Sequence, residues 1–171
     1  DPAGLGMANF ATLSSALAVD IEDRAKLTGI TPGPDVLEKV TLVFLQYSKQ
    51  FKAVDLARAN NLFQETAITL GNFMTKYDVI LSPTTAAPPP ALGRLGLMPT
   101  DFEKWGAEAA AYTPWTGVSN ATGQPSMSLP LAMSKDGLPI GVMVTGRYGD
   151  EATLLRLAGQ IERAAPWFGR R

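Results

Sequence analysis

The most specific part of the sequence is TPWTGVSNATGQPSMSLPL, residues 113–131, followed closely by GLPIGVMVTG, residues 137–146. Within these stretches, Ser126–Met133 and Ile140–Thr145 have the composition of two β-strands. Lys135-Asp-Gly137 between them predicts a turn, because glycine tolerates a positive φ. The C-terminal half is therefore expected to contain a sheet.

Apolar residues upstream of these strands recur at helical spacing in three segments. They predict a helix over residues 7–27, a second from near Asp35 to about Lys49, and a third over residues 53–76. Gly29 is expected to end the first helix as a C-cap, and Asp35 to favour the free N–H groups at the start of the second. Residues 1–6 have the composition of a loop.

The periodicity changes after the third helix. Tyr77–Pro83 is a short apolar run that proline ends, which is typical of a buried strand, and a proline-rich loop follows it. A short helix is expected over Thr100–Ala111, with Thr100 as its N-cap, and a last helix from Asp150 to about Ala165. The residues of the last helix expected to point inward are Leu154, Leu155, Ala158 and Ile161. The predicted class is α/β.

Composition narrows the function. The chain has 171 residues, 46% hydrophobic and 18% charged, with a net charge of −1. These values predict one globular domain and argue against a nucleic-acid partner. The sequence has no cysteine and no histidine, which excludes disulfides, thiolate chemistry and a Ser-His-Asp triad within this chain. No metal and no cofactor is expected.

The sequence also predicts where the protein is found. We find no apolar run near the roughly 20 residues that span a bilayer, and no signal-peptide pattern. A membrane role is therefore not expected, and the lack of cysteine favours the cytoplasm. The chain begins with Asp1 rather than methionine, which suits a processed, proteolysed or cloned fragment.

Four landmarks resemble, in the right order, the C-terminal part of the amidase signature family. They are YDVILSPT at 77–84, TPWTGVSNATGQP at 113–125, GLPIG at 137–141, and the segment from Asp150 to Pro166-Trp167. The resemblance implies an α/β fold with helices packed on a mixed β-sheet. It also implies that residues 1–171 are a single C-terminal portion of an amidase domain, helical over 1–76, with strands and a terminal helix over 77–171.

The family hydrolyses carboxamides, so the resemblance implies that the complete protein is an amidase acting on linear or cyclic amides without a metal or cofactor. Residues 124–131 and the ending Ala164-Ala-Pro-Trp167 are most similar to bacterial amidases near the 6-aminohexanoate cyclic dimer hydrolases. The family's nucleophilic serine, bridging cis-serine and neutral lysine lie in its N-terminal part. No residue of this chain inherits those roles, and the chain alone is expected to be inactive.

The resemblance also implies which residues border the substrate. Thr113, Trp115 and Thr116 are expected to border the acyl pocket, although Trp115 fits simple core packing equally well. The amidotransferases of the family carry an acidic residue seven positions before Asn120, where this chain has Thr113. That difference argues against an amidotransferase and for a less polar acyl group.

A structural role is expected for Asn120, Gly123 and Pro125, which would shape a loop at the rim of the sheet. One alternative is that Ser126 or Ser128 is a local nucleophile with Lys135 as its base. The favoured interpretation is that both serines are ordinary strand residues and that Lys135 is solvated. Similarly, Asp78 is expected to hold the helix-to-strand junction rather than to act in catalysis.

Two functions from different classes therefore remain. One is an amidase completed by an N-terminal half of the same enzyme, with a small amide as substrate and a homodimer as a possible assembly. The other is a catalytically inert truncated or processed fragment that acts only as a structural half. The intact mass of the purified protein and the presence of a second chain would separate them.

Overall fold

The computed structural model describes residues 1–168. The chain forms two compact units. The first contains Asp1–Phe63 and Ala91–Ala109, and the second contains Gln64–Pro90 and Ala110–Arg171. Helix α3 (Ala53–Met74) contributes residues to both units.

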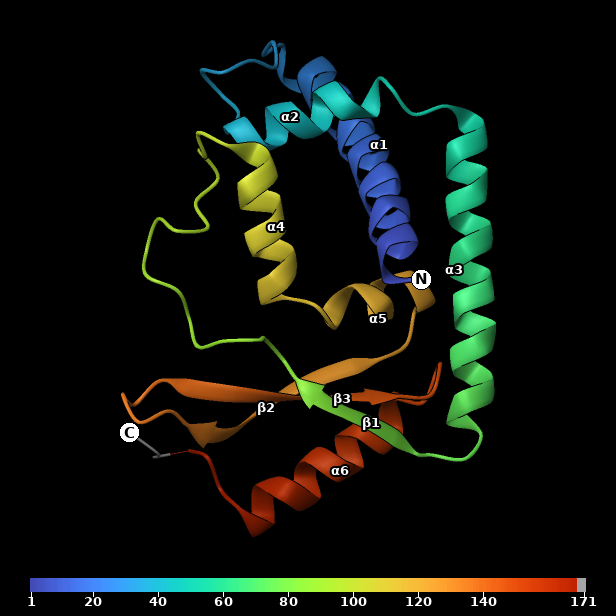
Figure 1. Cartoon of the computed structure of the whole chain (residues 1–171), viewed down its shortest axis with the longest axis vertical. Coiled ribbons are helices and arrows are strands. Elements are labelled where there is room, and N and C mark those ends of the chain that lie inside the picture. The colour runs from blue at the N-terminus through green and yellow to red at the C-terminus, as the bar shows by residue number, and fades with distance from the viewer. Residues whose placement is uncertain (169–171) are drawn as a thin grey trace. The chain divides into compact units, whose positions relative to one another are not determined.

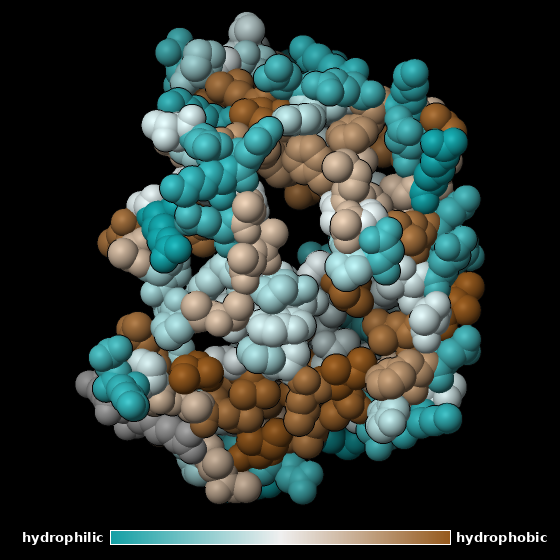
Figure 2. All heavy atoms as spheres, viewed as in Figure 1, coloured by the Kyte–Doolittle hydropathy of each residue, from teal (hydrophilic) through white to brown (hydrophobic). Residues whose placement is uncertain are grey.

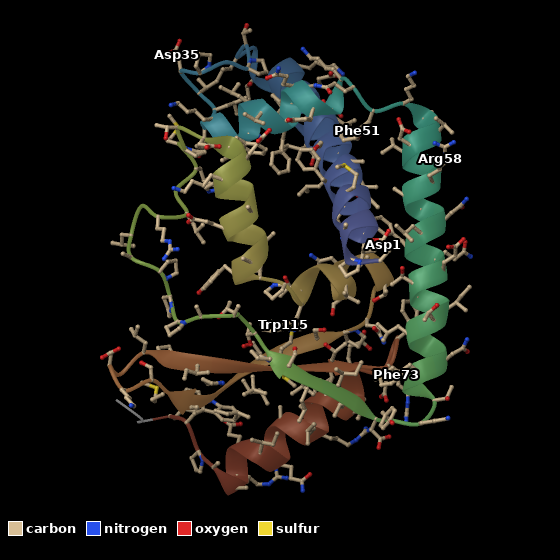
Figure 3. All side chains as sticks on the ribbon, in the orientation of Figure 1. Asp1, Asp35, Phe51, Arg58, Phe73 and Trp115 are labelled. Carbon is tan, nitrogen blue, oxygen red and sulfur yellow. The ribbon has the colours of Figure 1, made fainter. Side chains whose placement is uncertain are left out.

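The first unit is helical. It contains α1 (Pro2–Thr28), α2 (Lys39–Ser48), the start of α3 and most of α4 (Phe102–Tyr112). Helix α1 packs against α2, and a cluster of aromatic rings joins these helices, with Phe51 visible beside α1 in Figure 3. Neighbouring rings have centroids 4.9 to 6.3 Å apart, within the range of favourable aromatic pairs. The cluster consists of Phe10, Phe44, Tyr47, Phe51, Phe102 and Trp105.

The second unit contains the sheet, with strands β1 (Val79–Pro83), β2 (Ser126–Met133) and β3 (Pro139–Gly146). Strand β3 is central and pairs antiparallel with both neighbours, in the order β1-β3-β2. Helix α6 (Glu151–Ala164) covers one face of the sheet, and the short helix α5 (Thr116–Thr122) lies on the other side (Figure 1).

The core under α6 is small and apolar. Leu129 of β2, Val144 of β3 and Leu154 of α6 are buried at its centre. Val79, Trp167 and further apolar residues of α6 pack around them. Hydrophobic residues also gather at the surface over the strands (Figure 2), where the Leu81 residue is 65% exposed.

These features confirm the predicted α/β class, and the three strands within residues 1–168 are antiparallel. The two strands joined by a turn are confirmed, with Gly137 at φ 75°. Gly29 ends α1 in the left-handed region at φ 70°, as expected. The role predicted for Asp78 is also confirmed. Arg147 donates to its Oδ1 at 2.9 Å and to the Met74 carbonyl at 3.0 Å, which ties the end of α3 to the start of β1.

Three expected helix starts are wrong. Residues 2–6 are helical rather than a loop, because Asp1 caps α1 by accepting a hydrogen bond from the Gly4 N–H. Asp35 lies in a turn, and α2 begins only at Lys39. At the start of α4 it is Asp101, not Thr100, that accepts a hydrogen bond from the Lys104 N–H.

Two further features differ from the expectation. Helix α5 was not predicted, because its sequence TGVSNAT contains mostly residues of low helix propensity. In α6, Leu154 is buried, and Ala158 and Ile161 pack on the core as predicted, but Leu155 is 68% exposed. Leu155 follows Leu154 directly, and consecutive helical residues face different directions.

Helix α1 is long and apolar enough, by length and composition, to cross a membrane. This corrects the expectation that no segment of the chain reaches such a length. Core helices of globular proteins also meet these two criteria, and Leu5, Ala8, Ala11 and Ser14 of α1 are buried within the protein.

Asp150 provides a test of α6. Its carboxylate is the N-cap and accepts hydrogen bonds from the Thr153 hydroxyl at 2.7 Å and the Thr153 N–H at 3.2 Å. The Thr153 hydroxyl is the main cause that lowers the pKa of Asp150 below its ordinary value of 3.8. A lowered folded-state pKa means that the ionised carboxylate stabilises the fold above the unfolded pKa. This stabilisation is lost as the pH falls through the folded pKa.

We therefore expect Asp150→Ala to lower Tm at neutral pH, and the difference from the wild type to shrink as the medium becomes more acidic than the ordinary pKa. Thermal unfolding followed by circular dichroism over a pH series measures this difference. Asp150→Asn is the matched control, because asparagine caps a helix without titrating. A difference between wild type and Asp150→Ala that is independent of pH would contradict the assignment.

Candidate substrate-binding pocket

The two faces of the sheet differ in chemistry. Successive side chains of a strand point to opposite faces, so each face is set by alternate residues. Met127, Leu129 and Val144 belong to the face covered by α6. Ser126, opposite Thr145, and Ser128, opposite Met143, belong to the other face. The candidate site lies on this second face, toward α5.

Gly123 shapes the turn between α5 and β2. It ends α5 with φ 70° and donates its N–H to the Ser119 carbonyl at 2.9 Å. A Cβ added at Gly123 would lie 3.0 Å from Cε2 of Tyr148, so both the backbone and the packing favour glycine. Two residues later, the carbonyl of Pro125 accepts a hydrogen bond from the Gly146 N–H at 2.9 Å. These contacts support the structural roles expected for Gly123 and Pro125.

A pocket of about 240 Å³ lies between α5 and the strands β2 and β3. Two of the residues singled out in the sequence line it, Thr116 and Asn120. The other lining residues are Ser119, Ser126, Met127, Ser128 and Met143. Its lining therefore combines hydroxyls, one amide and the Met143 side chain, whereas the Met127 side chain packs toward α6. Among residues 1–168, none that lines the pocket is charged.

Thr113 and Trp115 lie just before this helix and are not among the lining residues of the pocket. Trp115 is half-buried at the N-cap position of α5, close to the sheet in Figure 3. Thr113 is exposed, and its carbonyl accepts a hydrogen bond from the Thr116 hydroxyl at 3.4 Å. The segment before them is anchored by the Ala86 N–H, which donates to the Tyr112 carbonyl at 2.9 Å. Their contact with a substrate stays a prediction.

Hydroxyl groups connect α5 with the sheet. The Ser126 Oγ lies 2.8 Å from Ser119 Oγ and 2.8 Å from Thr145 Oγ1, so these three groups form a chain of hydrogen bonds. A second pair joins Thr84 Oγ1 and Ser128 Oγ at 2.7 Å. We call these five residues the hydroxyl network.

Within the part of the chain that the structure describes, the contacts of the network join hydroxyls only, and none of them involves a general base. The serines that the sequence offered as local nucleophiles, Ser126 and Ser128, bond to other hydroxyls, whereas Lys135 is exposed in the turn between β2 and β3. A serine needs an adjacent base to become a nucleophile. Within residues 1–168, no group of three His, Cys, Asp or Glu side chains is arranged to hold a metal ion. The pocket can therefore bind through hydrogen bonds, but its own residues do not provide an amide-cleaving group.

The sequence reasoning missed Ser119 and the use of Ser126, Ser128 and Met143 as a pocket wall. A signal was present, because serine occupies alternate positions of a predicted strand and thus one face of it. The sequence did not reveal which element lies opposite this face, because α5 was not expected to be a helix.

Comparison with known protein families identifies the family of this chain. Residues 6–155 match the family model Amidase. The chain belongs to the amidase family, which confirms the resemblance seen in the sequence.

Individual relatives agree with this assignment. The Mycobacterium leprae protein called "Putative amidase AmiC" is 39% identical over 145 residues, which covers 85% of this chain and 28% of that protein. The 6-aminohexanoate-cyclic-dimer hydrolase of Paenarthrobacter ureafaciens is 40% identical over 102 residues, covering 56% of this chain and 20% of the enzyme. This chain therefore spans less than a third of the length of these relatives.

A solved structure of 6-aminohexanoate cyclic dimer hydrolase in complex with substrate superposes with a TM-score of 0.86 at 30% identity. The match covers 99% of this chain and 38% of that chain. A bacterial aryl acylamidase of the amidase signature enzymes shares the fold at a TM-score of 0.75 and 16% identity. Its match covers 99% of this chain and 35% of the acylamidase.

Gly141 of β3 gives a direct test of the hydroxyl network. A Cβ at this position would lie 2.6 Å from Ser128 Oγ and 2.7 Å from Thr84 Oγ1. We expect Gly141→Ala to separate this pair and to lower the free energy of unfolding by about 1–3 kcal/mol, the usual cost of overpacking. Adding Ser128→Ala should recover part of the loss, because it removes one of the two clashing atoms.

Chemical denaturation of the single and double variants measures both effects. Gly71→Ala in α3 is the control, because a Cβ there would have no atom within 4 Å. It should leave stability unchanged or raise it slightly. Equal stabilities of Gly141→Ala and the wild type would show that the predicted crowding is absent.

Proposed function

We propose that this chain is the C-terminal part of an amidase that hydrolyses the C–N bond of linear or cyclic carboxamides to an acid and an amine. The observation that carries the proposal is the match of residues 6–155 to the amidase family. One relative is named as a hydrolase of a cyclic amide dimer, and its substrate complex superposes on 99% of this chain. A cyclic or linear amide is therefore the proposed substrate class.

Amide hydrolysis requires a nucleophile, a base that takes its proton, and donors for the oxyanion. In the proposed enzyme the serine nucleophile, the bridging cis-serine, the lysine base and the oxyanion loop all belong to an N-terminal part, which is the proposed partner of this chain. The absence of histidine from the chain and the lack of a base at the hydroxyl network support this division. The chain would contribute a wall of the substrate site at Thr113, Trp115 and Thr116.

The acyl group of the substrate is proposed to be uncharged. Thr113 offers no carboxylate at the position where the amidotransferases of the family carry an acid. Among residues 1–168, those that line the pocket beside α5 are likewise all uncharged. An ionic group entering this pocket would lose hydration without gaining an opposite charge, which is unfavourable.

A second candidate is an inert structural half, made by truncation or processing. Large apolar residues of the second unit are exposed, among them Ile68, Phe73 and Leu81. Such exposed surface is typical of a site that another polypeptide covers.

The two candidates differ in a simple assay. We expect this chain, purified alone, to release no amine from a panel of linear and cyclic amides, and the same chain expressed with its N-terminal portion to be active. Amine release and the intact masses of all co-purifying chains are measured together. Turnover by the isolated chain would contradict the location of the catalytic residues. Inactivity of the folded complete protein on every amide would favour the inert half.

Trp115 gives a test of the proposed acyl wall. In the complete enzyme, Trp115→Ala should change the ratio of kcat/KM between short and long acyl amides, because an indole provides a large apolar surface. Trp115→Phe, which keeps an aromatic ring, is the matched control and should alter the ratio less. A chain-length preference that Trp115→Ala leaves unaltered would assign Trp115 to core packing.

A further inference from the structure

The hydroxyl network has more donor protons than it has contacts between its hydroxyls. Ser119, Ser126 and Thr145 carry three hydroxyl protons, but only two contacts join them. One proton therefore remains without an acceptor inside this chain of hydroxyls. Which residue carries it decides what the pocket can bind.

Burial limits the choice. Thr145 is only 6% exposed, and a buried donor without an acceptor costs about 1–3 kcal/mol. The favourable arrangements are those in which Thr145 donates its proton to Ser126. The spare proton then lies on Ser126 or on Ser119, and both of these serines line the pocket.

The rest of the pocket fits the same kind of ligand. Ser128 lines it and shares a single contact with Thr84, so this second pair also has one proton more than it has contacts. Met143, on the same face of the sheet as the serines, supplies an adaptable apolar surface beside the hydroxyls. Neutral hydroxyl donors over methionine suit a neutral acceptor such as a carbonyl oxygen and offer no countercharge to a carboxylate.

We propose that the pocket between α5 and the β2–β3 strands is a specificity subsite, in which Ser119 and Ser126 donate a hydrogen bond to a neutral carbonyl oxygen of the substrate. The inference rests on the proposed amidase function and extends it. The bound carbonyl is one that does not react, and the substrate class is therefore an amide with a second, uncharged carbonyl group.

Three six-carbon amides test the subsite in the complete enzyme. Hexanamide ends in a methyl group, adipamide in a second neutral carboxamide, and adipamate in a carboxylate. The wild type should bind adipamide with a lower KM than either of the others. In the double variant Ser119→Ala/Ser126→Ala, the KM for adipamide should rise about 3- to 10-fold, the effect of one lost hydrogen bond. The KM for hexanamide should change by less than about twofold, because its methyl end accepts no hydrogen bond.

The controls separate binding from folding. Ser119→Thr keeps a hydroxyl and should retain the low KM for adipamide. Thr69→Ala removes an exposed hydroxyl of α3 that bonds only to the Glu65 carbonyl, and should change neither KM. If the double variant has a lowered Tm, the single Ser119→Ala variant is compared with Ser119→Thr instead.

The outcomes are distinct for the two proposals. A wild-type enzyme that hydrolyses no amide overturns the proposed function itself. A wild-type enzyme that is active, but whose KM for adipamide is unchanged in the variants or changes together with that for hexanamide, overturns only the subsite. Equal wild-type KM values for adipamide and adipamate would also overturn it, because they would show no preference for a neutral group.

Discussion

The structure of the second unit depends on the alternation of side chains along the central strand β3. Val144 is completely buried and faces α6, whereas its neighbours Met143 and Thr145 face the opposite side. Both β1 and β2 pair with this strand, so its register determines which of their residues reach each face. A shift by one residue would exchange the apolar and the hydroxyl face. Burial of Val144 under α6 thus also fixes the position of Ser126 and Ser128.

Glycines permit the close contacts on the hydroxyl face. The space of a missing side chain at Gly141 admits the pair formed by Thr84 and Ser128, which no alanine at this position would tolerate without a shift. At the other end of the face, the positive φ of Gly123 turns the chain from α5 into β2. The polar face is therefore stabilised by hydrogen bonds between hydroxyls, each of modest strength, together with backbone geometry.

Much of the fold could be predicted because local signals agreed with the tertiary structure. The strands from Ser126 and near Ile140, the turn at Gly137 and the cap at Asp150 each have a local cause in residue type or spacing. Helix α5 could not be predicted, because its residues have a low helix propensity. Tertiary contacts such as that between Ser119 and Ser126 outweigh this low propensity. Tertiary contacts of this kind are invisible in a single sequence.

The candidate site was accessible from the sequence only in part. Thr116 and Asn120 were singled out through a family resemblance, and the structure places both at the pocket. Ser119 was missed because its importance follows from the pairing of Ser126 with Thr145, which depends on the strand register. Residues that act through a pairing partner carry no signal of their own until the partner is known.

The chemistry of the hydroxyl network indicates that substrate binding and bond cleavage depend on different groups in the proposed enzyme. A hydroxyl that is hydrogen-bonded only to other hydroxyls is a good donor to a carbonyl but a poor nucleophile, since no base accepts its proton. This part of the protein can therefore distinguish substrates by what it binds, while bond cleavage depends on groups elsewhere. Interactions made equally in the bound substrate and in the transition state lower KM and leave kcat unchanged. Selectivity arising at the hydroxyl face should thus be evident in KM, independently of the groups that carry out the reaction.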